Sequence, residues 1–352
     1  MTAASPVEGD GDARAIVEAY IHGGPADGAT VRANVEAWER IPLRPRVLRD
    51  LSTVDLGIEL FGLTSPVPVI AAPWAGHALL HPDGEVATAR GLRVAGIPLV
   101  QSSGSSVAVA EVAAHSGPFW QQIYVPADRG LIDGFLARAV AAGATAMVLT
   151  VDHPSVGNTL PFRSALGRVL DRSVHRWPGN FADVPAGADL GTAADLGPAD
   201  IGALARRTGL PVIVKGILRA DDARAAVDAG AAAIIVSNHG GRQLAGSITT
   251  AAALPEVVDA IGGAVPVLVD GGIRRGEDVV RALALGATAV LVGRPIASAL
   301  GGAGDGVGGE DGVARWASET VDDVRRAFLL CGAPSIASVG PDLIVRVPGG
   351  TP

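Results

Sequence analysis

The chain has too few of several residue types to build certain kinds of site. It contains a single cysteine, Cys331, among 352 residues. Neither a disulfide framework nor a thiolate metal site can therefore form within one chain, and a reducing cytoplasm fits. No run rich in lysine and arginine occurs, and the formal net charge is −8, which argues against nucleic acid or an anionic membrane surface as a partner. The apolar stretches are interrupted by glycine or charge and fall short of the ~20 residues that a membrane helix needs. The histidines lack metal-ligand spacing, so no bound metal is expected.

Apolar residues are abundant instead. They make up 48% of the chain, against 18% charged residues, which is enough for a large buried core. Eight short segments rich in Val, Ile or Leu predict strands, and most are separated by a helical pattern that ends in glycine. Strand starts recur every ~20–30 residues, as βα units do. We therefore predict an α/β fold, a (β/α)8 TIM barrel. The predicted strands are Val67–Pro73, Pro98–Ser102, Phe119–Tyr124, Ala146–Asp152, Pro211–Gly216, Ala233–Asn238, Val265–Gly271 and Ala289–Arg294.

Several segments extend this barrel. Residues 1–12 are polar and acidic and are expected to form a flexible tail, so that 13–352 make one domain. Ala13–Ile21 and Thr30–Arg40 predict an N-terminal helical extension. Residues 154–197, after the fourth strand, are too many for a plain connection, and we interpret them as a lid or substrate-facing insertion, with a surface loop as the alternative. A glycine- and aspartate-rich link, Gly301–Gly312, precedes a last amphipathic helix over Val313–Leu330.

The candidate catalytic residues follow the predicted strands, at the rim where such barrels carry out chemistry. His239 and Arg242 lie on a glycine-rich turn after the sixth strand, where they would supply a proton acceptor and an anion clamp. Asp152, ending the fourth strand, could orient His239 and stabilise its charged form, or cap the following loop. Lys215 ends the fifth strand, and three interpretations are open for it. It could be a Schiff-base lysine, a fixed cation beside an electron-accepting ring, or a lysine whose stem packs on apolar surface while its ammonium group reaches water. Tyr124 would place a phenol at the same rim.

A second group of residues predicts an anion site. Asp270, Gly271 and Gly272 follow the seventh strand and precede Arg274, and Gly293–Arg294 ends the eighth. The loops after these two strands commonly bind phosphate through backbone N–H groups and a helix start. The two arginines would add bidentate donors. The pattern predicts a phosphorylated cofactor or metabolite, and the alternative is glycine in ordinary turns with arginine as surface charge.

Four motifs carry a family resemblance: Leu43–Asp50, His81–Glu85, Ser237–Gln243 and Asp270–Gly276. With them the chain resembles the FMN-dependent 2-hydroxy acid oxidase/dehydrogenase family, which includes glycolate oxidase, lactate oxidase and mandelate dehydrogenase. The resemblance runs from about Tyr20 to the C-terminal helix. It implies a barrel that holds FMN at its C-terminal rim and oxidises a 2-hydroxy acid, or a related substrate with a Cα–H bond, to the 2-oxo product. It also implies oxygen or another compound as electron acceptor, and a homo-oligomer, either a tetramer or an octamer.

The resemblance assigns roles residue by residue. His239 matches the family's catalytic base, Asp152 the carboxylate that supports it, and Arg242 the arginine that pairs with the substrate carboxylate. Tyr20 and Tyr124 match tyrosines that hydrogen-bond the substrate.

The cofactor contacts are assigned in the same way. Lys215 matches the lysine near the flavin's pyrimidine edge, where its charge would stabilise the reduced ring. The positions that the resemblance assigns to FMN binding are Ala72, Pro73, Ala75, Ser102, Gln122, Thr150, Lys215, Ser237, Asp270, Gly271, Gly272, Arg274, Gly293 and Arg294.

Two departures from the family pattern bear on the substrate. Thr159 stands where many members carry a second substrate-binding arginine, and Gly104 stands where several have a bulky residue. Both indicate a larger substrate, either one with an aryl group or one without a free carboxylate, such as an amide, an amine or a carrier-bound acid. Two further readings stay open: an FMN-dependent isomerase without net oxidation, and a non-redox barrel that binds a phosphorylated metabolite. Trp74 follows the first strand, and the sequence favours equally a side chain that faces the site and one that only packs in the core.

Overall fold

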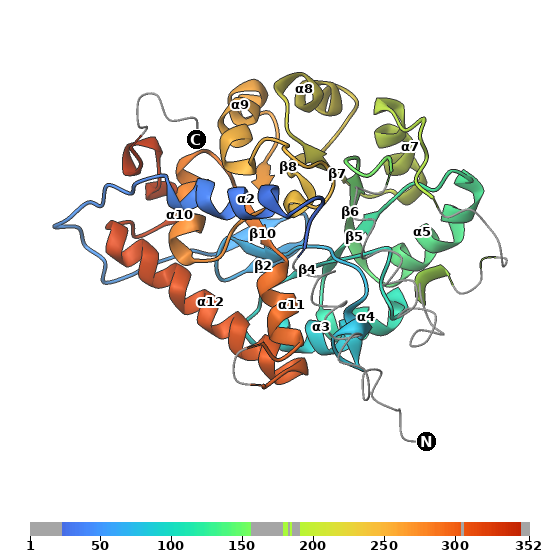
Figure 1. Cartoon of the computed structure of the whole chain (residues 1–352), viewed down its shortest axis with the longest axis horizontal. Coiled ribbons are helices and arrows are strands. Elements are labelled where there is room, and N and C mark those ends of the chain that lie inside the picture. Colours follow the sequence, from blue (N-terminus) through green and yellow to red (C-terminus); the bar gives the residue numbers. More distant parts are fainter. Residues whose placement is uncertain (1–22, 156–178, 182–183, 185–190, 304–305, 346–352) are drawn as a thin grey trace.

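The computed structural model describes residues 23–155, 179–181, 184, 191–303 and 306–345. Eight parallel strands form a closed barrel in the order β10-β3-β4-β5-β6-β7-β8-β9, and helices surround it (Figure 1). All eight predicted strands are present, so the predicted barrel is confirmed. The strands are β3 Val69–Ala71, β4 Leu99–Gln101, β5 Phe119–Ile123, β6 Ala144–Thr150, β7 Val212–Ile217, β8 Ala233–Val236, β9 Val267–Val269 and β10 Ala289–Val292.

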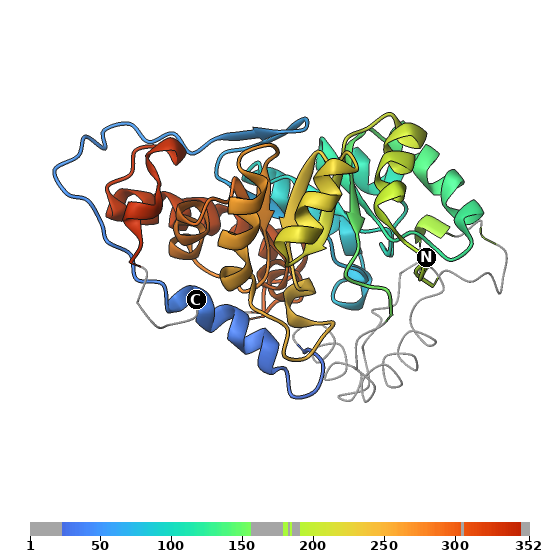
Figure 2. The same ribbon diagram turned by 90° about the horizontal axis from the view of Figure 1, so that it is seen from above.

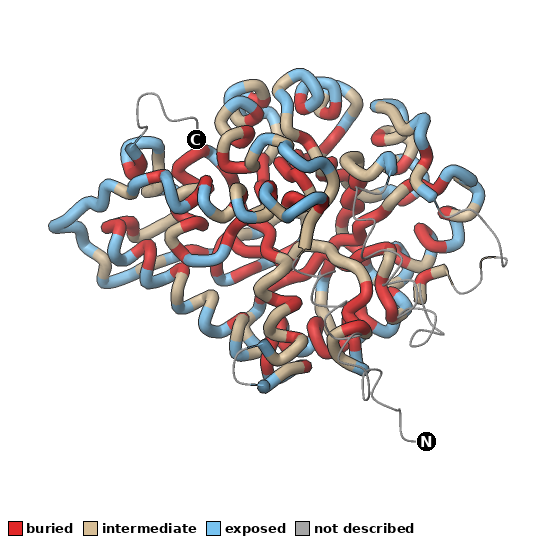
Figure 3. Tube along the Cα trace, in the orientation of Figure 1, coloured by how far each residue is buried: buried red, intermediate tan, exposed pale blue. Residues whose placement is uncertain are grey.

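The barrel interior is a packed core. Side chains such as Ile70, Trp120, Ile213, Ile235 and Leu268 fill it and are almost fully buried. The alternate residues of each strand pack outward against the helices in a larger apolar cluster, and buried residues are concentrated at the centre of the molecule (Figure 3). Burial on both faces explains why the strands read as continuous apolar runs rather than alternating ones.

The helices lie mainly between successive strands. Their sequences follow the acidic-start and glycine-stop pattern: α8 carries two aspartates in its first turn, and α9 ends at Gly262 in the left-handed conformation. The helices are α2 Ala29–Glu39, α3 Gly84–Val94, α4 Val109–Ser116, α5 Ile132–Ala141, α7 Pro198–Thr208, α8 Ala220–Asp228, α9 Thr250–Ile261, α10 Gly276–Ala284, α11 Arg294–Leu300 and α12 Gly309–Cys331. Short 3-10 turns are η1 His77–Leu79, η2 Arg129–Leu131, η3 Gly179–Phe181, η4 His239–Gly241, η5 Ile336–Ser338 and η6 Pro341–Leu343.

The link predicted over Gly301–Gly312 is shorter than expected, because α12 already begins at Gly309. At least one glycine of this segment serves close packing. A Cβ at Gly312 would lie 2.4 Å from the carbonyl oxygen of Ala299, so glycine lets α12 approach α11.

A small hairpin that the sequence analysis missed closes one end of the barrel. It consists of β1 Ile58–Leu60 and β2 Leu63–Ser65, which pair antiparallel. Trp120 donates its indole N–H to the carbonyl oxygen of Phe61 at 3.3 Å, and the two rings are tilted with centroids 6.0 Å apart. Helix α2 lies at the opposite end (Figure 2).

Some predictions fall outside the described residues: the tail 1–12, the helix Ala13–Ile21 and most of the insertion 154–197. Among the residues that are described, no helix combines the length and apolar character needed to cross a membrane.

Candidate active site

The predicted base and its carboxylate meet at the barrel rim. His239 follows β8 and Asp152 follows β6, and the His239 Nδ1 atom lies 3.0 Å from Asp152 Oδ1. This contact favours a proton on Nδ1 and leaves the Nε2 lone pair as the basic position. Tyr124, after β5, brings its hydroxyl to 3.4 Å from Nε2. The imidazole is therefore oriented by a carboxylate on one side and faces a phenol on the other, as the sequence analysis expected.

The backbone at His239 is held in an unusual conformation. Its φ is +59°, and Gly240 and Gly241 continue the turn at +64° and +77°. A side-chain-bearing residue in this region is uncommon and persists where surrounding contacts impose it. The His239 N–H donates to Ser237 Oγ at 3.0 Å, which is one of these contacts.

Asp152 stays ionised in this setting. Burial raises the pKa of its carboxyl group. The charge of His239, the hydrogen bond that His239 donates and the charge of Lys215 together outweigh burial, so the pKa is lowered below 3.8. The close approach of Asp152 depends on Gly216, where φ is +115° and a Cβ would lie 2.7 Å from the Cβ of Asp152. Gly216 is thus a functional position that the sequence analysis missed. Its available signal was a glycine inside a strand, directly after Lys215, which often marks a bulge, and the register does shift there.

Lys215 is a buried, permanent cation. Its Nζ lies 2.9 Å from Asp270 Oδ2 and donates to Ser237 Oγ at 2.8 Å. Burial lowers the pKa of the ammonium group, but Asp270 and Asp152 more than reverse this, and the pKa is raised above 10.5. A Schiff-base lysine must be neutral to react. Among the three readings of Lys215, the ion pair therefore favours the fixed cation.

Three predicted flavin contacts form one hydrogen-bonded group at the ends of β4, β5 and β6. Gln122 Oε1 accepts from the Ser102 hydroxyl at 3.3 Å and from the Ser103 N–H at 3.1 Å. Its Nε2 donates to Thr150 Oγ1 at 3.1 Å. These polar groups line the rim beside Lys215 because β6 pairs with β7, with Thr150 opposite Lys215.

The predicted anion site gathers several guanidinium groups. Arg274 and Arg294 border a pocket of about 430 Å³, together with Ser298 and Arg315. Arg294 also donates to the carbonyl oxygen of Gly240 at 2.8 Å. Burial and the neighbouring charges of Arg242 and Arg274 lower the pKa of Arg294 to about 9. Cations that repel one another in this way are stabilised by a bound anion, so the residues fit a phosphate group.

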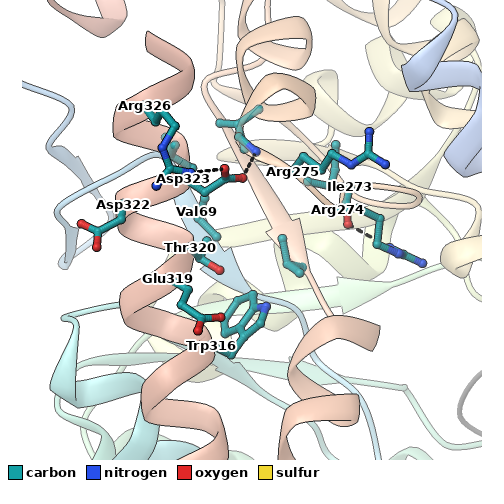
Figure 4. A pocket seen from close by; sticks show the side chains of 14 residues that line it. Val69, Ile273, Arg274, Arg275, Trp316, Glu319, Thr320, Asp322, Asp323 and Arg326 are labelled. Atoms are coloured by element: carbon teal, nitrogen blue, oxygen red, sulfur yellow. Dashed lines mark hydrogen bonds and ion pairs between the residues drawn. The ribbon is translucent and has the colours of Figure 1, made fainter. Parts of the chain in front are cut away.

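A second pocket adjoins the first on the outer side of the barrel (Figure 4). Arg274 and Arg275 border it from the loop after β9, and α12 contributes Trp316 and Glu319 as well as the ion pair between Asp323 and Arg326. Its lining carries both signs of charge, and it shares Arg274, Trp316 and Glu319 with the first pocket.

The glycines of the predicted phosphate loop have a packing role. Gly271 and Gly272 have φ values of +88° and +87°. A Cβ at Gly272 would lie 2.2 Å from the carbonyl oxygen of Asn34 in α2. At Gly293 a Cβ would meet only Ala72, at 3.7 Å. The close approach of α2 therefore accounts for the need for glycine at 272, and the FMN contacts of these three glycines stay predictions.

The first-strand residues Ala72, Pro73 and Ala75 follow β3 at the rim, and their contacts to FMN also stay predictions. Trp74 stacks on His77, with ring centroids 3.4 Å apart and an interplanar angle of 12°. It lines a small cavity with Glu85 and Gln101, which favours the packing reading for this tryptophan.

The loop that carries Gly104 is held from two sides by residues that were not singled out as functional. Glu85, in α3, accepts from the N–H groups of Ser106 at 2.8 Å and Val107 at 3.2 Å. Asn180 donates to the carbonyl oxygens of Ser102 and Ser103 at 3.3 and 3.2 Å and accepts from the Val109 N–H at 2.8 Å. Glu85 belongs to a motif that carried the resemblance, whereas nothing in the sequence marked Asn180. Tyr20 and Thr159 lie outside the described residues.

Fold and site together define a (β/α)8 barrel enzyme with an imidazole–carboxylate pair and an arginine-lined anion pocket at its rim. Among the described residues, no group of three or more His, Cys, Asp or Glu side chains could hold a metal ion. The profile of the FMN-dependent dehydrogenase family matches residues 13–346.

Relatives with assigned activities agree with this match. The chain is 42% identical over 336 residues to a peroxisomal (S)-2-hydroxy-acid oxidase of Oryza sativa subsp. japonica, covering 91% of this chain and 88% of the relative. It is 42% identical over 332 residues to a 4-hydroxymandelate oxidase of Amycolatopsis orientalis, covering 91% and 90%. A solved mandelate oxidase variant superposes with a TM-score of 0.84 at 40% identity, covering 96% and 97%.

The chain therefore belongs to the FMN-dependent dehydrogenase family. It is an FMN-dependent oxidoreductase that oxidises a 2-hydroxy acid to the 2-oxo acid.

The buried polar groups at the rim fit this cofactor. Asp270 Oδ1 is buried and makes no hydrogen bond among the described residues, while Oδ2 of the same carboxylate is held by Lys215. An oxygen in this position suits a hydroxyl donor such as those of a ribityl chain. The residues that would hold FMN are therefore the Ser102–Gln122–Thr150 group and Lys215 at the ring, Asp270 at the ribityl chain, and Arg274 and Arg294 at the phosphate.

Proposed function

We propose that this enzyme oxidises a 2-hydroxy acid with a bulky, aryl side chain and that His239 is the base. The pairing of His239 with Asp152 at 3.0 Å is the observation that carries the proposal. A buried carboxylate stabilises the imidazolium that forms when Nε2 accepts a proton. Bound FMN would supply a two-electron acceptor, so that the substrate loses two electrons and two protons in all, one proton from its hydroxyl group and one from its α-carbon.

The other rim residues bind and orient the substrate. Arg242, three residues after His239, pairs with the substrate carboxylate, and Tyr124 hydrogen-bonds the hydroxyl near Nε2. The family resemblance supports Tyr20 as a second tyrosine that hydrogen-bonds the substrate. Holding the substrate between this clamp and the ring site is a proximity effect that lowers the barrier.

The preference for an aryl group follows from Gly104. This residue has no side chain, and Glu85 and Asn180 make five hydrogen bonds to the backbone between Ser102 and Val109. These bonds restrain the loop against moving into the place of the missing side chain. Two relatives act on mandelate-type acids by name. Thr159 adds no cation at the place of the family's second arginine, which suits a substrate held by one guanidinium.

A substrate panel tests the proposal. The enzyme is mixed without oxygen with mandelate, 4-hydroxymandelate, mandelamide, glycolate and lactate, and the loss of flavin absorbance is followed. We expect the aryl acids to reduce the flavin fastest. Rapid reduction by glycolate or lactate with little by the aryl acids would refute the size argument. If mandelamide were the best substrate, the enzyme would act on an amide and not on a carboxylic acid.

The role of His239 has its own test. His239→Ala should retain FMN and slow flavin reduction by about 10²–10⁴-fold, as loss of a general base does. An unchanged rate would remove His239 from the mechanism.

We also propose oxygen as the electron acceptor, a cytoplasmic location and assembly into a tetramer or octamer. The names of the oxidase relatives support oxygen, although several of these relatives are peroxisomal by name. Oxygen uptake with mandelate and light scattering after gel filtration test the first and last of these.

A further inference from the structure

Helix α2 reaches the turn of His239 through a reciprocal pair of amides. Asn34 Nδ2 donates to Asn238 Oδ1 at 2.8 Å, and Asn238 Nδ2 donates back to Asn34 Oδ1 at 2.9 Å. Both side chains are buried, Asn34 with 1% exposed and Asn238 with 4%. Asn238 immediately precedes His239, so this pair of amides fixes the residue next to the base in the chain.

The same amides also hold the turn on its far side. Asn238 Oδ1 accepts from the Gly241 N–H at 2.9 Å, and Asn238 Nδ2 donates to the carbonyl oxygen of Ile248 at 3.0 Å. Each amide oxygen and nitrogen of Asn238 is thus used, and its orientation is determined. The Asn238–Gly241 hydrogen bond spans His239, which stabilises the positive φ of that residue.

The helix backbone confirms how closely α2 approaches. A Cβ at Gly241 would lie 2.8 Å from the Val31 nitrogen in α2. Thr30 Oγ1 accepts from the Gly246 N–H at 2.8 Å. Helix and turn are therefore in direct contact, and Asn34 is the residue of the helix whose side chain bonds to Asn238.

We propose that Asn34 is a positioning residue for the base, which it holds in its reactive orientation through Asn238. This inference rests on the proposed role of His239. Oxidation requires the imidazole Nε2 to point at the substrate while Nδ1 keeps Asp152, and both directions follow from the backbone of the turn. Asn34 touches neither the substrate nor His239 itself.

The test uses two substitutions at one position. Asn34→Ala removes both contacts to Asn238, and with them the longer hydrogen bond that Asn34 Oδ1 accepts from the Thr250 N–H at 3.4 Å. It should slow anaerobic flavin reduction by about 10²-fold, the effect of an ångström-scale misplacement, with KM and FMN content near wild-type values. Asn34→Asp makes the loss depend on pH. The neutral carboxyl donates its O–H to Asn238 Oδ1 and restores the pair, whereas the carboxylate sets two oxygens against each other.

The reduction rate of Asn34→Asp, relative to wild type, should therefore recover as pH falls through the pKa of the introduced carboxyl. The ionisable groups tied to this turn are His239, which follows Asn238 in the chain, and Arg294, which donates to the carbonyl oxygen of Gly240. They are present in both proteins, so the ratio isolates the introduced group. Glu36→Gln, on the exposed face of the same helix, is the matched control and should leave the rate unchanged.

The outcomes separate the two hypotheses. If His239→Ala is slow while Asn34→Ala reduces its flavin at the wild-type rate, the inference is wrong and the base assignment stands. If His239→Ala is as fast as wild type, the proposed function fails. If Asn34→Ala does not fold, a pH-independent rate ratio for Asn34→Asp still overturns the positioning role, and its recovery at low pH supports it.

Discussion

Gly216→Ala should slow the reaction by displacing Asp152. A Cβ at position 216 would lie 2.7 Å from the Cβ of Asp152, where ordinary contact begins at 3.4 Å, so the two groups must separate by about 0.7 Å. Residue 216 lies on β7, which is placed between β6 and β8 in the barrel. Movement of Asp152 away from β7 is therefore movement away from His239. The Oδ1–Nδ1 distance, now 3.0 Å, would leave the range of a good hydrogen bond.

The size of the effect follows from the interaction lost. A hydrogen bond to a charged group contributes about 1.5–3 kcal/mol, and about 1.4 kcal/mol is a tenfold change in rate. Flavin reduction should be about 10- to 100-fold slower. The protein should also lose stability, by roughly 1–2 kcal/mol for the positive φ and about 1–3 kcal/mol for the forced contact.

The assay is single-turnover flavin reduction without oxygen, combined with denaturant unfolding. Gly230→Ala is the matched control, because φ is +96° there and a Cβ would meet no atom within 4 Å. It should lose stability through φ alone and reduce its flavin normally. A folded, FMN-containing Gly216→Ala enzyme with the wild-type rate would show that the spacing of Asp152 and His239 does not limit the chemistry.

Three further outcomes follow from the charges of the site. Lys215→Met should slow flavin reduction and lower the flavin midpoint potential, because the buried cation beside the proposed ring site is lost; an unchanged potential in a redox titration would contradict this. Arg294→Met should weaken FMN binding, because the predicted phosphate site then loses one of its buried cations; fluorescence titrations test it, and an unchanged dissociation constant speaks against the arginine. Burial lowers the pKa of His77 from 6.5 to about 3, so the unfolded chain binds this proton before the native chain does. Stability should therefore be lost as pH falls from 6.5 towards 3, and unfolding midpoints of His77→Gln should decline less steeply over that interval.

The barrel could be predicted from sequence because its strands are buried on both faces. Runs such as Ala233–Val236 then contain little besides Val, Ile, Leu and Ala, and the helices between them end at glycine. The β1–β2 hairpin could not be predicted in this way. Each of its strands has three residues, which is too few for an alternating pattern to be recognised. Its position is set by packing against Trp120, a contact far along the chain.

The residues of the site also include some that could be predicted from the sequence and some that could not. His239, Asp152 and Lys215 were predictable because parallel strands bring their C-terminal ends to one rim. Asn34 and Asn180 were not, because they act through partners 204 and 78 residues away. Asn34 occupies a helix interior, where asparagine has no local signal. Gly272 has a role that the sequence did not indicate: its assignment to FMN binding stays a prediction, and the structure adds that it accommodates α2.

The charged side chains at the rim fall into two groups, one with paired charges and one with an excess of positive charge. On one side the cation and carboxylates are matched, since Lys215 pairs with Asp270 and its charge also lowers the pKa of Asp152. On the other side burial, together with the like charges of Arg242 and Arg274, lowers the pKa of Arg294 to about 9. A dianion is stabilised at the second side and would be repelled by the carboxylates at the first. A phosphorylated ring compound therefore has one favourable orientation, with its phosphate at the arginines and its ring towards Lys215 and the base. Asp270 pairs with Lys215 through Oδ2, and its buried Oδ1 would be left for the chain that joins phosphate and ring.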